Sequence, residues 1–159
     1  MKHLKGDKTK TEFIITISVI LGVTVLLVLL KLVFSSVRKK LQVHIQERFA
    51  GIEIIGATTE ADFLGKLSKG GWQIRGNGGL VLTKNGVFFL RSIPFREYMI
   101  PIKSITDVSM PNSFNGKSIF SKLLCVQYRV DSGTETMAWV VKNPEKWKKA
   151  IEKLVAIDC

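Results

Sequence analysis

The sequence is poor in the side chains that build most catalytic and metal sites. Its 159 residues include two cysteines and two histidines, with 13 acidic residues against 24 basic ones. Cys125 and Cys159 are too few for a disulfide framework, and His44 has no cysteine or second histidine near it in a zinc-binding pattern. We therefore expect no metal, no cofactor, no small-molecule substrate and no enzymatic activity.

Three stretches resemble ligand-binding or catalytic motifs without matching them. Gly76-Asn77-Gly78-Gly79 is followed by neither Gly-Lys-Ser/Thr nor a helix, so we interpret it as a turn. Asn115-Gly116-Lys117-Ser118 is similar to the end of a phosphate-binding loop, but Pro111 stands where the loop needs a glycine. The acids within residues 53–62 lack the spacing of a catalytic pair. Binding is therefore a better expectation than catalysis.

A long apolar run is the main feature that is present. The eighteen residues from Phe13 to Leu30 are uncharged and mostly apolar, close to the length of about 20 residues that crosses a bilayer as a helix. A cleaved signal peptide has a shorter apolar core of about 7–15 residues. A buried helix would need a larger domain around it, and an interfacial helix would need a polar face. We predict a transmembrane helix over residues 13–35, after a basic tail over residues 1–12.

Positive charge flanks this helix on both sides. Lysines precede it, and Arg38, Lys39 and Lys40 follow it, so the positive-inside rule gives nearly a tie. The Arg-Lys-Lys cluster and an unpaired Cys125 inside a predicted buried strand favour a reducing compartment. We predict a single-pass protein of the cell membrane with a cytoplasmic C-terminal domain, in which Cys159 is accessible and Cys125 is protected.

A helical stem is predicted over residues 36–51. Gly51 is suited to end it, and an apolar residue recurs at every fourth position: Val37, Leu41, Ile45 and Phe49. Arg38, Lys39 and Lys40 could form a basic collar on anionic lipid. The alternative, which we favour, is an ordinary flank of a membrane span.

The remaining residues, 52–159, predict one α+β domain. A short helix is expected from Thr59 to Gly70, with Phe63, Leu64 and Leu67 on its apolar face. Apolar and alternating runs predict about seven short antiparallel strands, at residues 52–55, 72–75, 80–83, 87–91, 98–102, 124–130 and 137–141.

Turn and capping signals organise these elements. Asn85-Gly86 is typical of a tight hairpin, and Pro101 restricts its strand to an edge or a bulge. Asn143-Pro144-Glu145 begins an amphipathic C-terminal helix whose apolar stripe contains Trp147, Ala150, Ile151, Leu154 and Val155.

This pattern resembles the pleckstrin-homology (PH) superfold in its bacterial PH-like or GRAM-like form, over roughly residues 52–155. The resemblance is carried by three segments: Gly79 to Phe89 with its Asn85-Gly86 turn, Ile100 to Val108, and Trp139 to Trp147. It implies a barrel of bent antiparallel sheets closed at one end by the C-terminal helix. This superfold hosts lipid, peptide and protein binding alike.

The resemblance also implies a place for a ligand. Phosphoinositide-binding PH domains carry a long basic loop between their first two strands, with a lysine followed by a Lys/Arg-x-Arg triplet. We take Lys84-Asn85-Gly86 as the matching turn, and Arg91 is followed by Ser92 and Ile93, so the triplet is missing. The candidate basic face is Lys84, Arg91, Arg96 and Lys103. These residues either contact lipid headgroups or only keep the barrel soluble.

The expected function is a membrane-anchored, non-catalytic interaction module that binds a protein partner or acts as a scaffold. The partner would contact either the open edge of the sheet or the apolar loop over residues 110–114, the latter through Met110 and an exposed Phe114. The alternative is peripheral sensing of anionic lipid headgroups by the basic face. Nucleic acid is not expected, because a closed barrel buries or separates the aromatic residues that would stack on bases.

Overall fold

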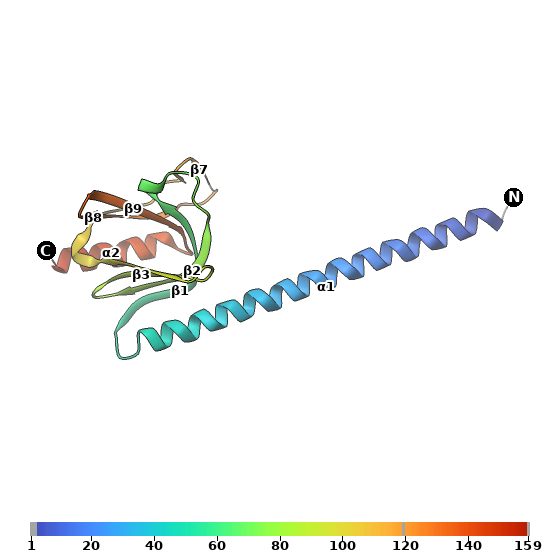
Figure 1. Ribbon diagram of the computed structural model, residues 1–159, viewed down its shortest axis with the longest axis horizontal. Helices are drawn as coiled ribbons and strands as arrows, with labels where there is room; N and C mark the ends of the chain where they lie inside the picture. Colours follow the sequence, from blue (N-terminus) through green and yellow to red (C-terminus); the bar gives the residue numbers. More distant parts are fainter. Residues whose placement is uncertain (1–2, 119, 159) are drawn as a thin grey trace. The chain divides into compact units, whose positions relative to one another are not determined.

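A computed structural model describes residues 3–118 and 120–158, with side chains described for 12–118 and 120–157. Cys159 and the first two residues of the predicted basic tail lie outside this range. The chain forms two compact units, Met1–Lys39 and Lys40–Cys159. Helix α1 (His3–Arg48) crosses the boundary, so its last residues belong to the second unit (Figure 1).

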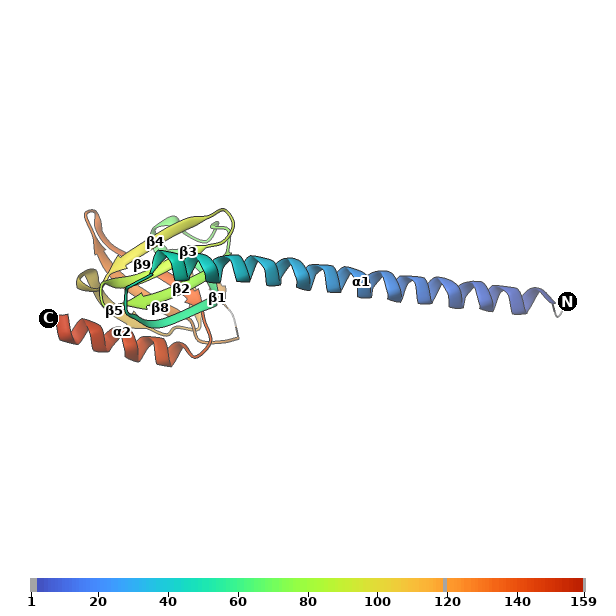
Figure 2. The same cartoon turned by 90° about the horizontal axis from the view of Figure 1, so that it is seen from below.

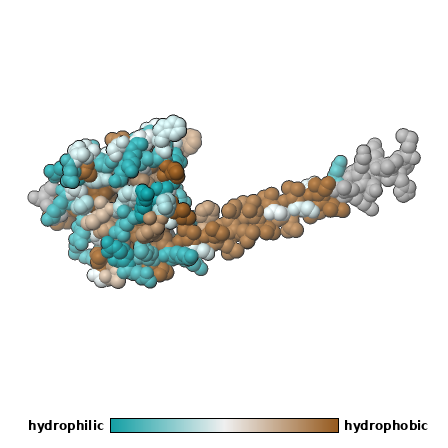
Figure 3. Space-filling model, viewed as in Figure 1, coloured by the Kyte–Doolittle hydropathy of each residue, from teal (hydrophilic) through white to brown (hydrophobic). Residues whose placement is uncertain are grey.

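In the first unit, α1 exposes its apolar side chains. Within residues Glu12–Arg48, an 18-residue segment has a mean hydropathy of 3.0, and none of its residues is buried. By length and composition this helix could cross a membrane. Figure 3 shows hydrophobic side chains along this part of the helix. The hydroxyls of Thr16, Ser18, Thr24 and Ser36 each donate to the carbonyl four residues earlier. Their polar groups are thereby satisfied within the helix, as a hydrocarbon environment requires.

The second unit contains an antiparallel sheet of seven strands with the order β4-β3-β2-β1-β9-β8-β5. The strands are β1 (Ile54–Lys66), β2 (Gly76–Thr83), β3 (Gly86–Arg91), β4 (Arg96–Pro101), β5 (Ile105–Ser109), β8 (Leu124–Val130) and β9 (Gly133–Val140). A separate hairpin is formed by β6 (Ser113–Phe114) and β7 (Lys117–Ser118). Two 3-10 turns, η1 (Leu67–Lys69) and η2 (Ile102–Ser104), and helix α2 (Pro144–Asp158) complete the fold.

The expected α+β class is confirmed: a long N-terminal helix, seven antiparallel strands in the main sheet and a C-terminal helix. The sheet is not closed, because its edge strands β4 and β5 do not pair with each other. The fold is therefore a sandwich or a barrel-like structure. Pro101 lies in β4, an edge strand, where its missing N–H donor is tolerated.

The helix predicted from Thr59 to Gly70 is wrong. These residues belong mainly to β1, and only Leu67–Lys69 adopt a helical turn. The neighbours Phe63 and Leu64 are both buried but lie in different hydrophobic clusters, as alternate side chains of a strand do. Because β1 pairs with both β2 and β9, it is an interior strand, and its two faces pack into different clusters.

Two further predictions in this region are wrong. Residues 72–75 form no strand, and the glycines from Gly76 to Gly79 begin β2 instead of forming a turn. These glycines permit close packing: a Cβ on Gly78 would lie 2.2 Å from the carbonyl oxygen of Leu90, and one on Gly79 would lie 2.6 Å from Cδ1 of Ile45. The strand β5 was not predicted.

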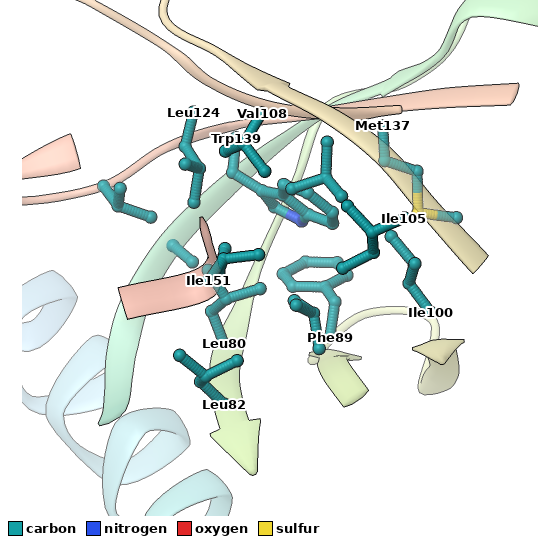
Figure 4. Packing of buried hydrophobic residues seen from close by; sticks show 14 of the residues in the cluster. Leu80, Leu82, Phe89, Ile100, Ile105, Val108, Leu124, Met137, Trp139 and Ile151 are labelled. Carbon is teal, nitrogen blue, oxygen red and sulfur yellow. The ribbon is translucent and has the colours of Figure 1, made fainter. Parts of the chain in front are cut away.

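The main core lies on one face of the sheet, where α2 covers it. Trp139, Phe89 and Leu80 are fully buried there with Ile151 of α2 (Figure 4). The predicted stripe of Trp147, Ala150, Leu154 and Val155 packs against this core. Helix α2 begins at Pro144 as predicted, after Asn143, whose carbonyl accepts hydrogen bonds from the N–H groups of Lys146 and Trp147.

The end of α1 covers the other face of the sheet. Leu41, Ile45 and Phe49 are buried together with Val81, Phe88 and Leu90, which alternate with the core residues of β2 and β3. Figure 2 shows these last turns of α1 passing over the strands. The predicted period of four therefore marks a packing surface, and the helix ends at Arg48 just before Gly51, whose φ is +78°.

Candidate anion-binding site

The structure does not bring the seven predicted contact residues together. Arg91 and Arg96 are direct cross-strand partners at the β3–β4 turn. Lys84 and Lys103 lie at the opposite end of these strands, where the N–H of Ile102 donates to the carbonyl of Asn85. Of the remaining three, Arg38 and Lys39 belong to the first unit and Lys40 to the second. The predicted basic face is thus divided.

Lys84 already has an anionic neighbour. Its Nζ lies 2.6 Å from a carboxylate oxygen of Glu53, and both side chains are mostly exposed. This pair reduces the local positive charge at that end of the sheet. The pair at the other end, Arg91 and Arg96, has a different environment.

Arg91 and Arg96 line a cavity of about 110 Å³ with residues from β1, η1 and the loop that follows. Four lining residues are cationic and none is acidic; the full lining is Phe63, Lys66, Lys69, Gln73, Ile74, Arg91, Arg96 and Tyr98. Like charges facing each other across two strands destabilise a sheet. A bound anion would relieve that repulsion, so the arrangement favours an anionic ligand.

Aromatic rings form one wall of this cavity. The Nζ of Lys66 lies 5.3 Å from the centre of the Tyr98 ring, within the range of a cation–π contact. Tyr98 in turn packs against Phe63, with ring centres 5.5 Å apart. The guanidinium of Arg91 donates to the carbonyls of Ile93 and Arg75, at 3.1 Å and 3.5 Å. Ring contacts and backbone hydrogen bonds thus hold Lys66 and Arg91 beside the cavity.

The loop over residues 67–75, which joins β1 to β2, is held by side-chain hydrogen bonds. Gln73 accepts from the N–H of Lys66 at 2.8 Å and donates to the carbonyls of Lys66 and Gly70 at 2.6 Å and 2.8 Å. The amide of Asn115 donates to the same two carbonyls. The ammonium of Lys117 donates to the carbonyl of Gln73 at 2.8 Å. The β6–β7 hairpin therefore fixes the shape of this loop.

Glu135 of β9 fixes the start of the loop. It is buried and accepts hydrogen bonds from the hydroxyl and N–H of Ser68 and from the N–H of Thr136. Burial alone would raise the pKa of Glu135, but these hydrogen bonds and the charge of Lys66 outweigh it, so the pKa is lowered. Glu135 is therefore ionised at neutral pH, and its charge is satisfied by the loop. Burial and the Glu135 charge also raise the pKa of Tyr128 to about 12.

Sequence reasoning missed Lys66 and Lys69. The loop between the first two strands is residues 67–75, whereas Lys84 and Asn85 join the second strand to the third. The turn at Lys84-Asn85-Gly86 is therefore not the loop between the first two strands, because residues 59–66 are part of strand β1 and not of the expected helix. The signal that could have found the site is the cluster of Lys66, Lys69 and Arg75 around a glycine pair.

The expected exposure of Phe114 is wrong. Its side chain is 7% exposed and packs with Leu64, Leu123 and Cys125, because the β6–β7 hairpin folds it against the sheet. Met110 is half-buried. Cys125 is buried as predicted, and burial together with the nearby Asp107 charge raises the pKa of its thiol to about 12.

A larger open groove of about 820 Å³ lies at the start of α2. Its lining includes Lys122, Lys146 and Lys149 but also Glu145, which lies 3.2 Å from Lys122. This mixture of charges does not select an anion, unlike the smaller cavity. Among the residues whose placement the structure describes, no group of three histidine, cysteine, aspartate or glutamate side chains could hold a metal ion.

Comparisons with known proteins add a weak likeness of structure. No protein-family model and no curated protein matches the sequence. A solved structure from work on SsgB mutations that correlate with longitudinal cell division during sporulation of Streptomyces coelicolor has 15% identity and a TM-score of 0.30. The match covers 62% of this chain and 87% of that one. At this TM-score the likeness carries no argument about this chain.

Proposed function

We propose that the chain is a membrane-anchored, non-catalytic PH-like module whose domain binds anionic headgroups of the bilayer that holds its anchor. Residues 13–35 span the cell membrane in this proposal, and the domain is cytoplasmic. The observation that carries the proposal is the cavity with four cationic lining residues and no acidic one.

The position of this cavity within the second unit supports the proposal. The rings of His44 and Phe95 lie 4.9 Å apart, and Arg48 lies 3.2 Å from Glu97, so the end of α1 and strand β4 run in the same direction. Lys40, which precedes His44, therefore lies toward the β3–β4 turn. The cavity is therefore at the end of the second unit that contains Lys40, the first residue of that unit.

The size and charge of the cavity suit a single anionic group. Sites for small-molecule ligands have volumes of about 300–1,000 Å³, well above that of this cavity, so a headgroup phosphate is a better match than a whole cofactor. Each lysine or arginine near an anionic surface contributes about 1 kcal/mol. Four such side chains provide enough attraction for weak, reversible docking of a domain that is already tethered.

A protein partner was the leading expectation from the sequence. Burial of Phe114 removes the observation on which docking at residues 110–114 rested. Met110 remains only half-buried at the edge of that loop. The geometry therefore favours the lipid surface over a protein partner as the ligand of this module.

The test uses the full chain in nanodiscs of phosphatidylcholine with and without phosphatidylglycerol. Hydrogen exchange at residues 67–75 and 91–96 should slow only in the anionic discs. The double variant Lys69→Gln/Arg96→Gln should weaken this docking about 30-fold, from about 1 kcal/mol for each charge. The matched control Lys84→Gln/Lys103→Gln removes two exposed cations from the opposite end and should leave docking nearly unchanged.

Two results would contradict the proposal. Equal exchange in neutral and anionic discs would show that the domain does not bind headgroup charge. Protection at about 1 M salt, where the Debye length is about 3 Å, that equals the protection at low salt would show that charge does not contribute to the contact.

The orientation is tested by thiol labelling of intact cells. A membrane-impermeant reagent should label neither cysteine before permeabilisation, and Cys159 first afterwards. Cys125 should react only when the domain unfolds, because its thiol is buried and its pKa is about 12. Labelling of Cys159 in intact cells would reverse the orientation and contradict the cytoplasmic placement.

A further inference from the structure

Four large apolar side chains are exposed beside the cationic cavity. Their exposed fractions are 100% for Trp72, 80% for Ile74, 71% for Ile93 and 56% for Phe95. Trp72 and Ile74 belong to the β1–β2 loop, and Ile93 and Phe95 to the β3–β4 turn. We call these four residues the apolar tip. Scattered apolar residues are ordinary on a protein surface, but a group gathered from two adjacent loops marks an interaction site.

The loop architecture imposes the exposure of Trp72 and Ile74. Gln73, which lies between them, turns its side chain inward to bond Lys66 and Gly70. Trp72 and Ile74 on either side of it make no such contact and are exposed. Asn115 and Lys117 hold the same loop from the β6–β7 hairpin. These polar contacts therefore present two apolar side chains to the surroundings.

The two loops meet at the cavity. Ile74 lines it together with Arg91 and Arg96, and the Arg91 guanidinium bonds one carbonyl from each loop, those of Arg75 and Ile93. Cationic and exposed apolar side chains therefore share one end of the domain, the end that also contains Lys40. Such a combination is typical of surfaces that lie in the interfacial layer of a membrane.

We infer that the apolar tip inserts into the interfacial layer of the bilayer while the adjacent cations hold headgroup phosphates. This inference rests on the proposed function and extends it to a second, apolar mode of contact. Tryptophan is enriched at the level of the headgroups, where its ring is partly apolar and partly polar. Lysine and arginine place their stems along apolar surface and their charges in water, so both sets of side chains are satisfied at the same depth.

Trp72 provides its own spectroscopic probe. The full chain is placed in phosphatidylcholine and phosphatidylglycerol nanodiscs whose acyl chains are brominated, and the emission of Trp72→Phe is subtracted from that of the unaltered protein. Trp139 is fully buried and Trp147 packs against the main core, so the difference reports Trp72. Quenching and a blue shift of this difference signal are the expected result.

A second variant measures the contribution of the tip to docking. Trp72→Ser/Ile74→Ser should lower the equilibrium constant of docking by at least about tenfold, because two large side chains lose their apolar burial. Hydrogen exchange at residues 91–96 measures this constant. The matched control is Ile157→Ser, which removes a side chain that is 73% exposed from the C-terminal part of α2. Both sites are exposed, so thermal unfolding should be unchanged in each variant.

The outcomes separate this inference from the proposed function. If Trp72 is unquenched while exchange still depends on phosphatidylglycerol, insertion is overturned and headgroup binding stands. If both signals are absent, both are overturned, and a protein remains as the occupant of the tip. If Trp72 is quenched equally in neutral discs, insertion is supported and the requirement for anionic headgroups is overturned.

Discussion

Helix α1 contains two apolar stretches that meet different surroundings. From Phe13 to Phe34 the large apolar side chains are all exposed, with no polar face to separate them. From Leu41 to Phe49 only every fourth residue is buried, and the intervening positions are polar or charged except for the exposed Val43. The same backbone geometry thus carries side chains that suit an environment apolar on all sides and side chains that suit one apolar on a single side.

The comparison shows what each pattern requires. A uniformly apolar helix needs no partner within its own chain, because lipid can cover all of it. A helix with a period of four needs one matching surface, which Val81, Phe88 and Leu90 provide here. Substitutions in the two stretches can test these two requirements separately.

The largest expected effect is at the centre of the second stretch. Ile45→Ala should lower the free energy of unfolding of the domain by about 2–5 kcal/mol, because it leaves a cavity between α1 and the sheet. Val43→Ala changes a side chain that is 50% exposed and should stay within about 0.5 kcal/mol. Chemical denaturation measures both, and equal losses would contradict the packing of the stem on the sheet.

A charge in the first stretch should act on membrane insertion alone. Leu26→Arg should cost about 3 kcal/mol of insertion free energy and shift the protein from the membrane fraction. The domain's own unfolding transition should not move, because Leu26 is exposed and belongs to the first unit. Leu26→Phe is the control, and retention of both variants in the membrane would contradict the prediction of a span.

A methyl group added to the sheet beneath the second stretch should destabilise the domain less than Ile45→Ala does. The size of this loss should depend on the side chain at position 45. Gly79→Ala should destabilise the domain by about 1–3 kcal/mol, because its Cβ would lie 2.6 Å from Cδ1 of Ile45. In an Ile45→Val background that Cδ1 is absent, so the cost should fall. A double-mutant cycle that shows strict additivity would exclude this contact.

The smallest effect is expected for the ion pair between the stem and β4. Arg48 and Glu97 lie 3.2 Å apart, and Arg48 is partly exposed. Removing the pair by Glu97→Gln should cost about 0.2–1 kcal/mol and should be screened by salt. A double-mutant cycle with Arg48→Gln measures the coupling free energy of the pair. A value above that range would show that the pair helps to position the stem on the sheet.

Local patterns predicted the elements better than they predicted their partners. The period of four identified Leu41, Ile45 and Phe49, and the apolar stripe of α2 was also confirmed. The surface that receives the stem comes from β2 and β3, some forty residues further along the chain. Sequence periodicity shows that a face is apolar but not which distant residues cover it.

The candidate site was predicted only in part for a similar reason. Arg91 and Arg96 were named as basic residues, but Lys66 and Lys69 were missed because an apolar pair at Phe63 and Leu64 suits a helix as well as a strand buried on both faces. Asn115 and Glu135 shape the loop from positions remote in sequence. Their side-chain roles depend on the sheet order, which no local pattern contains.

The burial of the stem against β2 and β3 determines where a water-soluble fragment of this protein has to start. A fragment that starts at residue 52 would lack Leu41, Ile45 and Phe49, and would expose Val81, Phe88 and Leu90 side by side on the sheet. Such a surface favours self-association and precipitation. A fragment that starts at Lys40 retains the covering helix, so limited proteolysis should yield a stable product when cleavage falls before Leu41.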